Sequence, residues 1–188
     1  MLKFLEMEGV LNNILYIDCD GVIFNTIETA FKMMKENNID ITDNRKVDYF
    51  FRSTSWELLL ENSIIINDAI NKIKLLKEKQ IYKDVIILTK LSGNYTEERL
   101  KRETFSLLLP NMKVITLPRD YDKALVVSSM NNILVDDEEK NVISWNNHGG
   151  TGIRFMKDLI DFENDIINDL NDIENANGVK LLRKTRFL

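Results

Sequence analysis

The chain has 188 residues and a formal net charge of −5, with 44% hydrophobic and 29% charged residues. This composition is typical of a soluble globular protein with one core and room for a small insertion. The negative charge argues against long nucleic acid as the main partner, and no apolar run is long enough to cross a bilayer. A single cysteine excludes an internal disulfide and suits a reducing compartment. We therefore expect a cytoplasmic protein without a membrane partner, as a monomer or homodimer.

The chain begins with a short extension, residues 1–13, which lacks a signal-peptide pattern. The apolar run Ile14–Ile17 then predicts a buried strand. Helical spacing predicts a helix over 25–38, whereas 39–51 is mixed, with a turn at Asp43–Asn44.

A further short helix is expected to end near Leu60, with Ser53 or Ser55 as its cap. The whole stretch 25–66 lacks strand alternation, so we expect it to be a small helical cap. The cap would be inserted into a core made of residues 1–24 and 67–188.

From residue 67 onward, helical and apolar segments alternate. The expected helices span 67–79, 95–109, 138–148 and 157–175, with a short helix or turn over 123–129. The expected strands span 84–89, 113–117, 132–137 and 152–156. Strands that alternate with helices predict an α/β fold, a Rossmann-like doubly wound and mostly parallel sheet with helices on both faces.

Two acids follow the first strand directly. Side chains alternate along extended backbone, so Asp18 and Asp20 point the same way and Cys19 points the other way. Gly21 then permits a sharp turn. Two converging carboxylates repel each other, and Mg²⁺ is the hard cation that suits them. Because Asp and Gly are also common turn residues, this pattern alone fits an ordinary strand-ending turn equally well.

The ends of two later strands carry matching chemistry. Thr89 ends one apolar run, Asp136 and Asp137 end another, and Lys123 precedes the latter. Ligands of doubly wound sheets bind at the carboxyl ends of the strands, so these side chains are expected to converge. Carboxylates, a hydroxyl and an ammonium are what phosphoryl transfer through a covalent intermediate requires.

These stretches resemble the four motifs of the haloacid dehalogenase superfamily of phosphohydrolases. The matching stretches, in the family's order, are Asp18–Val22, Val85–Thr89, Lys123 and Ile133–Asp137. The resemblance covers roughly residues 14–156 and implies a Mg²⁺-dependent phosphomonoesterase with an aspartyl-phosphate intermediate.

The resemblance also implies roles for individual residues. Asp18 would be the nucleophile and Asp20 the general acid and base, while Thr89 and Lys123 would hold the phosphoryl oxygens. The implied metal ligands are Asp18, Asp20, Asp136 and Asp137. The candidate substrate-binding residues are Lys90, Arg119, Phe51 and Trp56, with Arg119 as the rival of Lys123 for the phosphate and Tyr49 and Phe50 as further stacking candidates.

Two features resemble the 5'(3')-deoxyribonucleotidase branch: the early helical insertion, and the segment from Asp136 through Trp145 to Ile153. The stretch Ile23–Thr26 departs from that branch, which has a small residue, an Asp and an aromatic there. The expected substrate is a small phosphorylated molecule, a nucleoside monophosphate first. A sugar phosphate, a polynucleotide 3'-phosphate, or a binding domain without turnover are the alternatives.

Overall fold

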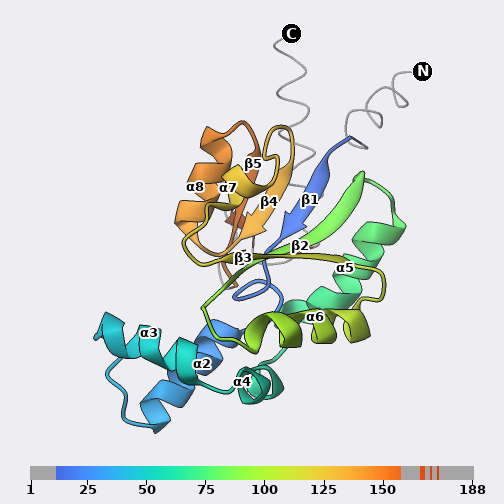
Figure 1. Cartoon of the computed structure of the whole chain (residues 1–188). Coiled ribbons are helices and arrows are strands. Elements are labelled where there is room, and N and C mark those ends of the chain that lie inside the picture. Colours follow the sequence, from blue (N-terminus) through green and yellow to red (C-terminus); the bar gives the residue numbers. More distant parts are fainter. Residues whose placement is uncertain (1–11, 158–165, 168–169, 171–172, 174–188) are drawn as a thin grey trace, which may run out of the picture.

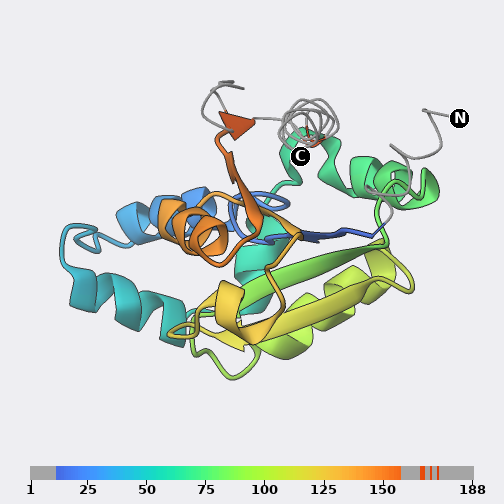
Figure 2. The same cartoon turned by 90° about the horizontal axis from the view of Figure 1, so that it is seen from above.

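A sheet of parallel strands runs through the middle of the molecule (Figure 1). The structure, a computed structural model, describes residues 12–157, 166–167, 170 and 173. Within these residues the sheet has six strands in the order β3-β2-β1-β4-β5-β6, which Figure 2 shows from above. The strands are β1 (Ile14–Ile17), β2 (Asp84–Leu91), β3 (Lys113–Pro118), β4 (Ile133–Asp136), β5 (Thr151–Phe155) and β6 (Ile166–Ile167). The predicted α/β fold with a doubly wound parallel sheet is confirmed.

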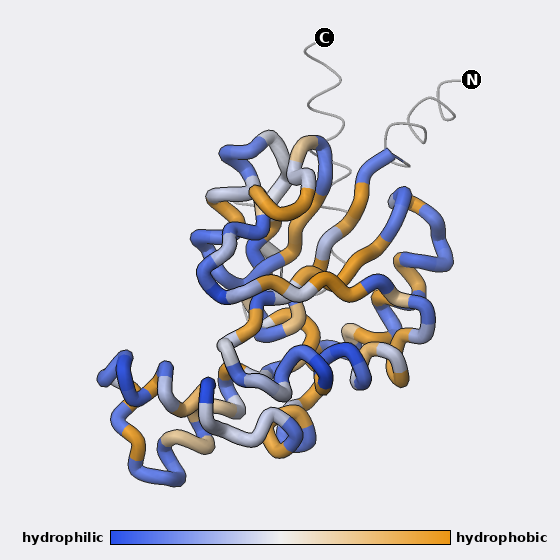
Figure 3. The backbone as a smooth tube through the Cα atoms, in the orientation of Figure 1, coloured by the Kyte–Doolittle hydropathy of each residue, from blue (hydrophilic) through white to orange (hydrophobic). Residues whose placement is uncertain are grey.

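Helices pack on both faces of this sheet. All helices of the described residues, including those beyond the end of the sheet, are α2 (Thr26–Glu36), α3 (Asn44–Ser53), α4 (Trp56–Asn62), the single turn η1 (Ile66–Asp68), α5 (Ala69–Glu78), α6 (Glu97–Leu108), α7 (Lys123–Val126) and α8 (Glu139–Asn147). Side chains of β1 alternate between two cores, because strand side chains point to opposite faces. Leu15 and Ile17 pack with Phe105 of α6, whereas Tyr16 packs with Trp145 of α8. Figure 3 shows the hydrophobic residues concentrated along the strands between these helices.

The order in which successive strands are added to the sheet reverses at β1. Strands β2 and β3 lie on one side of β1, and β4, β5 and β6 lie on the other. Tyr16 is accordingly paired with Ile86 of β2 and with Leu134 of β4. The crevice for a ligand in such a sheet opens outside the carboxyl ends of the strands at this reversal. Asp18 and Asp20 therefore follow β1 at the position where a ligand is expected.

Helices α2, α3 and α4 lie together beyond this end of the sheet (Figure 1). They form a separate hydrophobic cluster, whose buried members are Ala30, Met34, Phe50, Trp56 and Leu59. The predicted turn at Asp43–Asn44 is wrong, because the Asp43 side chain accepts hydrogen bonds from two backbone N–H groups and starts α3. The predicted cap at Ser55 is confirmed, since its hydroxyl accepts from the N–H of Leu58 at 3.3 Å.

The predicted last helix, 157–175, is wrong at Ile166–Ile167. These residues form β6, which pairs in parallel with Arg154 and Phe155 of β5, because branched isoleucines suit a strand as well as a helix. Leu170 and Ile173 are buried, as expected. The rest of that segment and most of the N-terminal extension lie outside the described residues. In the described part of the chain, no helix combines the length and apolar character needed to cross a membrane.

Candidate active site

Asp18 lies directly after β1, at the reversal point of the sheet. Its N–H donates to the carbonyl of Val135 on β4 at 2.9 Å, which extends the β1–β4 pairing by one residue. Lys123 Nζ lies 2.8 Å from Asp18 Oδ1 and 2.7 Å from Asp136 Oδ2. Burial opposes the lysine charge, but the two carboxylates outweigh it and hold the pKa of Lys123 above its ordinary value. Lys123 thus ties the acid after β1 to the acid that ends β4.

Asp18, Asp136 and Asp137 form a cluster of carboxylates. One oxygen of each lies within 4.8 Å of the others. Burial and repulsion from neighbouring acids raise the pKa of Asp18 to about 7, although Lys123 opposes the shift. Burial and the charges of Asp18 and Asp136 raise the pKa of Asp137 to about 8. When all three acids are ionised, one lysine does not balance them, and an excess of negative charge remains at this point.

The donor set of this acid cluster fits a hard divalent cation such as Mg²⁺, which prefers carboxylate oxygens and relieves their repulsion. Gly21 makes room for the Asp137 carboxylate: φ is +79° at Gly21, and a Cβ at this position would clash with Asp137 Oδ2. Asp136 is held in place by Asn141 Nδ2, at 3.0 and 3.1 Å from its two oxygens. The Asp20 side chain, predicted as a fourth ligand, does not belong to this cluster of three.

Asp20 instead accepts hydrogen bonds from side chains of three elements, α2, α6 and β2. Thr26 Oγ1 at the start of α2 donates to Asp20 Oδ1 at 2.6 Å. Lys101 Nζ on α6 lies 2.6 Å from Asp20 Oδ2, and Thr89 Oγ1 on β2 donates to the same oxygen at 3.4 Å. The two acids of the first motif therefore have different surroundings: Asp18 faces the acid cluster, and Asp20 faces hydroxyls and a lysine.

Lys101 and Glu97 were not predicted from the sequence. Lys101 Nζ lies 2.7 Å from Glu97 Oε1, and both side chains are almost fully buried. Burial opposes the charge of Lys101, yet Asp20 and Glu97 hold its pKa above the ordinary value. The sequence carries one weak signal for them: Glu97 and Lys101 share a helix face with the apolar Phe105, each four residues from the next, but this spacing alone does not show that the pair is buried.

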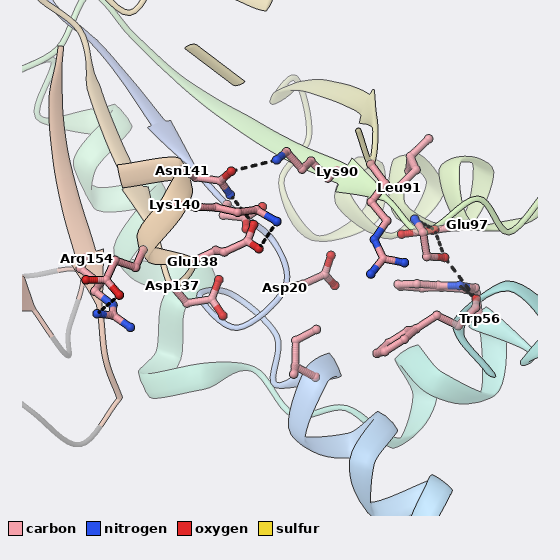
Figure 4. Close-up of a pocket in the computed structure, with 16 residues that line it drawn as sticks. Asp20, Trp56, Lys90, Leu91, Glu97, Asp137, Glu138, Lys140, Asn141 and Arg154 are labelled. Carbon is pink, nitrogen blue, oxygen red and sulfur yellow. Dashed lines mark hydrogen bonds and ion pairs between the residues drawn. The ribbon is translucent and has the colours of Figure 1, made fainter. Parts of the chain in front are cut away.

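A pocket of about 500 Å³ opens in front of these acids (Figure 4). Asp20 and Asp137 both line it and are labelled in that view. Lys90 lines it and donates to Asn141 Oδ1 at 2.8 Å. Arg119 also lines it and is paired with Asp48 of α3. The structure thus brings both predicted cations to the substrate side of the acids, whereas Lys123 lies buried behind Asp18.

The predicted aromatic residues divide into two groups. Phe51 and Trp56 line the pocket, whereas Tyr49 and Phe50 are not among its described lining residues. Trp56 is only 3% exposed, and Lys101 Nζ lies 4.7 Å from the centre of its ring. Phe51 is half-buried. A flat ligand group could therefore stack more readily on Phe51 than on Trp56.

The fold and the pocket together define a doubly wound α/β protein with an acidic ligand site at the reversal of its sheet. A scan against models of protein families finds none that matches the chain, and a search of curated proteins finds no match. Solved structures, in contrast, share the fold.

The chain has the fold of hydrolases of the haloacid dehalogenase (HAD) superfamily. A HAD-superfamily hydrolase of subfamily IA, variant 1, from Geobacter sulfurreducens aligns with a TM-score of 0.59 and 16% identity, covering 89% of this chain and 97% of that chain. The HAD-hydrolase YfnB from Bacillus subtilis, solved bound to magnesium, aligns with a TM-score of 0.57 and 14% identity, covering 87% and 97%. The L-2-haloacid dehalogenase from Xanthobacter autotrophicus, with chloropropionic acid covalently bound, aligns with a TM-score of 0.52 and 9% identity, covering 87% and 97%.

Proposed function

We propose that this protein is a Mg²⁺-dependent phosphomonoesterase whose preferred substrates are nucleoside monophosphates. The observation that carries this proposal is the pair Asp18 and Asp20, two carboxylates one residue apart in different surroundings. Asp18 is held by Lys123 at 2.8 Å, and Asp20 by Thr26 and Lys101, each at 2.6 Å. This difference in surroundings supports Asp18 as the attacking acid and Asp20 as the acid that transfers a proton.

In the first step, a carboxylate oxygen of Asp18 attacks phosphorus while the bond from phosphorus to the ester oxygen breaks. The leaving oxygen takes a proton from the Asp20 carboxyl. In the second step, Asp20 takes a proton from water as that water attacks the aspartyl-phosphate, which releases phosphate and restores Asp18. Lys90 and Arg119 line the pocket, which supports a role for both in binding phosphoryl oxygens.

Asp18 and Asp137, with Asp136 behind them, would hold Mg²⁺, since these three form the acid cluster. The bound ion would offset the charge of the carboxylates and of the phosphoryl group. A solved neighbour with the same fold is bound to magnesium, which supports this choice of metal.

Dehalogenation is the alternative raised by the solved neighbours. A halide leaves as a stable anion and needs no proton, whereas an alkoxide leaving group does. Asp20 and its donors Thr26 and Lys101 supply that proton-transfer group. An intact Asp18–Asp20 pair also argues against a binding domain without turnover.

We further propose that the cap, residues 25–66, selects the leaving group. The core holds it near the pocket through its own loops: Asn94 Nδ2 donates to the carbonyls of Arg52 and Thr54, each at 2.9 Å. Ser92 Oγ donates to the carbonyl of Phe51 at 3.2 Å. Phe51 is thereby fixed on the pocket wall, where a nucleobase could stack on it.

The test is a substrate panel, assayed with Mg²⁺ and again with a chelator. It contains a nucleoside monophosphate, a hexose phosphate, a 3'-phosphorylated oligonucleotide, an aryl phosphate and chloropropionate. We expect Mg²⁺-dependent phosphate release, fastest from the nucleoside monophosphate, and no chloride release. Preference for the hexose phosphate or the oligonucleotide would overturn the substrate class, and chloride release without phosphate release would overturn the reaction.

A further inference from the structure

We propose that Lys101, together with Glu97, is a positioning residue that fixes the Asp20 carboxyl for proton transfer to the leaving group. This inference rests on the proposed phosphomonoesterase function and adds α6 to the reaction. Glu97 lines the pocket but Lys101 does not, so the lysine would act through Asp20 and not on the substrate.

The ammonium of Lys101 lies at the centre of a buried polar network. Its Nζ lies 2.6 Å from Asp20 Oδ2, 2.7 Å from Glu97 Oε1, and 3.1 Å from both Thr89 Oγ1 and the Lys90 carbonyl. Three N–H donors therefore meet four acceptors, and the lysine has no freedom to point elsewhere. Its side chain has no exposed surface, whereas that of Asp20 is 16% exposed.

This network fixes the orientation of one carboxyl group from two sides. Thr26 Oγ1 holds Asp20 Oδ1 at 2.6 Å, and Lys101 holds Oδ2 at the same distance. With both oxygens bonded, rotation of the carboxyl is restricted, and its exposed edge faces the pocket. Proton transfer requires such placement of the acid within hydrogen-bond reach of the reacting oxygen.

Glu97 offsets the charge of Lys101, so the lysine can hold Asp20 while the pair adds little net charge near that carboxyl. Its Oε1 faces Lys101, and its Oε2 accepts from the N–H and the hydroxyl of Ser92, each at 2.6 Å. The glutamate offsets the lysine, so the pair orients Asp20 mainly through hydrogen bonds. It also fixes Ser92, directly after β2, the strand that carries Lys90.

Stability alone does not require this arrangement. A buried ion pair costs several kcal/mol of desolvation per ion, and apolar replacements of similar volume are often neutral or stabilising. Two other i,i+4 pairs of α6, Glu98–Arg102 and Arg99–Glu103, lie at the surface. The one pair turned inward is the pair that contacts Asp20.

The experiment compares two phosphate esters whose leaving groups differ in whether they need a proton to depart. The double variant Lys101→Met/Glu97→Gln removes both charges together, so neither is left buried alone. The matched control on the same helix is Arg99→Met/Glu103→Gln. Each is assayed on a nucleoside monophosphate and on an activated dinitrophenyl phosphate, whose leaving group departs without a proton. Circular dichroism and the melting temperature confirm folding.

We expect kcat/KM of the double variant to fall about 100-fold for the nucleoside monophosphate and by less than about 3-fold for the activated ester, since general acid catalysis contributes about 10²–10⁴. The control should stay within about 2-fold of wild type on both. The single variant Glu97→Gln, which keeps its shape, should show the same selective loss at about tenfold, and it decides the matter if the double variant does not fold.

Equal losses on both esters, or no loss on either, would overturn the positioning role while leaving the phosphomonoesterase intact. A wild-type protein that releases phosphate from neither ester would overturn the proposed function and this inference with it.

Discussion

The substitution Asp137→Asn removes one charge from the cluster of Asp18, Asp136 and Asp137, whose oxygens lie within 4.8 Å of one another. Without a divalent cation, this change should stabilise the protein at high pH. Burial and the neighbouring acids raise the pKa of Asp137 from 3.8 to about 8. Between these two values the native state binds more protons than the unfolded state, so stability falls as pH rises through this window and is constant above it.

The magnitude follows from the same shift. Each pKa unit corresponds to about 1.4 kcal/mol, and the rise from 3.8 to about 8 sets an upper bound of ~6 kcal/mol. Asp137 lines an open pocket, where water screens much of this repulsion, so we expect Asn to raise the free energy of unfolding by about 2 kcal/mol at about pH 9. For a chain of this size that is roughly 4–8 °C in melting temperature. At about pH 5 the gain should shrink below about 1 kcal/mol.

The assay is thermal unfolding in a chelator at both pH values, followed by a Mg²⁺ titration. The exposed acid Asp120, after β3, provides the control Asp120→Asn, which should change neither curve. Mg²⁺ should stabilise the wild type and the control, but stabilise Asp137→Asn much less, because binding to the native state alone raises its stability. If Asp137→Asn is no more stable than wild type at high pH, the ionised Asp137 is not destabilised by its burial and its neighbouring acids. If the variant responds to Mg²⁺ as strongly as wild type, Asp137 is not a ligand of the metal.

Three further changes test other parts of the site. Asp18→Asn should abolish phosphate release with an unchanged circular dichroism spectrum, because an amide cannot attack phosphorus; residual activity near wild type would exclude Asp18 as the nucleophile. Gly21→Ala should cost about 1–2 kcal/mol in denaturant unfolding and weaken Mg²⁺ binding by calorimetry, since its Cβ would clash with the Asp137 carboxylate; unchanged affinity would contradict the packing. Phe51→Ala should raise KM for a nucleoside monophosphate about tenfold and leave an aryl phosphate within a few-fold, whereas the exposed Tyr49→Ala should change neither; equal effects on both substrates would favour a sugar phosphate.

The alternation of apolar and helical segments was sufficient to predict the sheet and most helices. Buried parallel strands appear as continuous apolar runs, so β1 and β4 were found within one residue of their ends, and with them the convergence of Asp18, Asp136 and Lys123. Helix α3 was missed because its pattern is weak and the cap at Asp43 also fits a turn.

The network behind Asp20 could not be predicted from spacing alone. Glu97 and Lys101 look like an ordinary exposed pair, and an i,i+4 pair is usually a surface feature. Only the position of α6 against β2 shows that this pair faces inward, and that position depends on long-range packing. Similarly, the sequence does not show that Asp20 turns from the acid cluster toward Lys101, because both orientations satisfy the same local pattern.

The central claim is that Asp18 becomes phosphorylated during turnover. For the direct measurement, the protein is incubated briefly with an aryl phosphate and Mg²⁺ and then quenched with acid. Borohydride reduces any acyl phosphate that has formed, and mass spectrometry examines the peptide that contains Asp18. The account predicts conversion of Asp18 to homoserine, dependent on both Mg²⁺ and substrate. Phosphate release at a normal rate with Asp18 unmodified, or with the label on another residue, would contradict it.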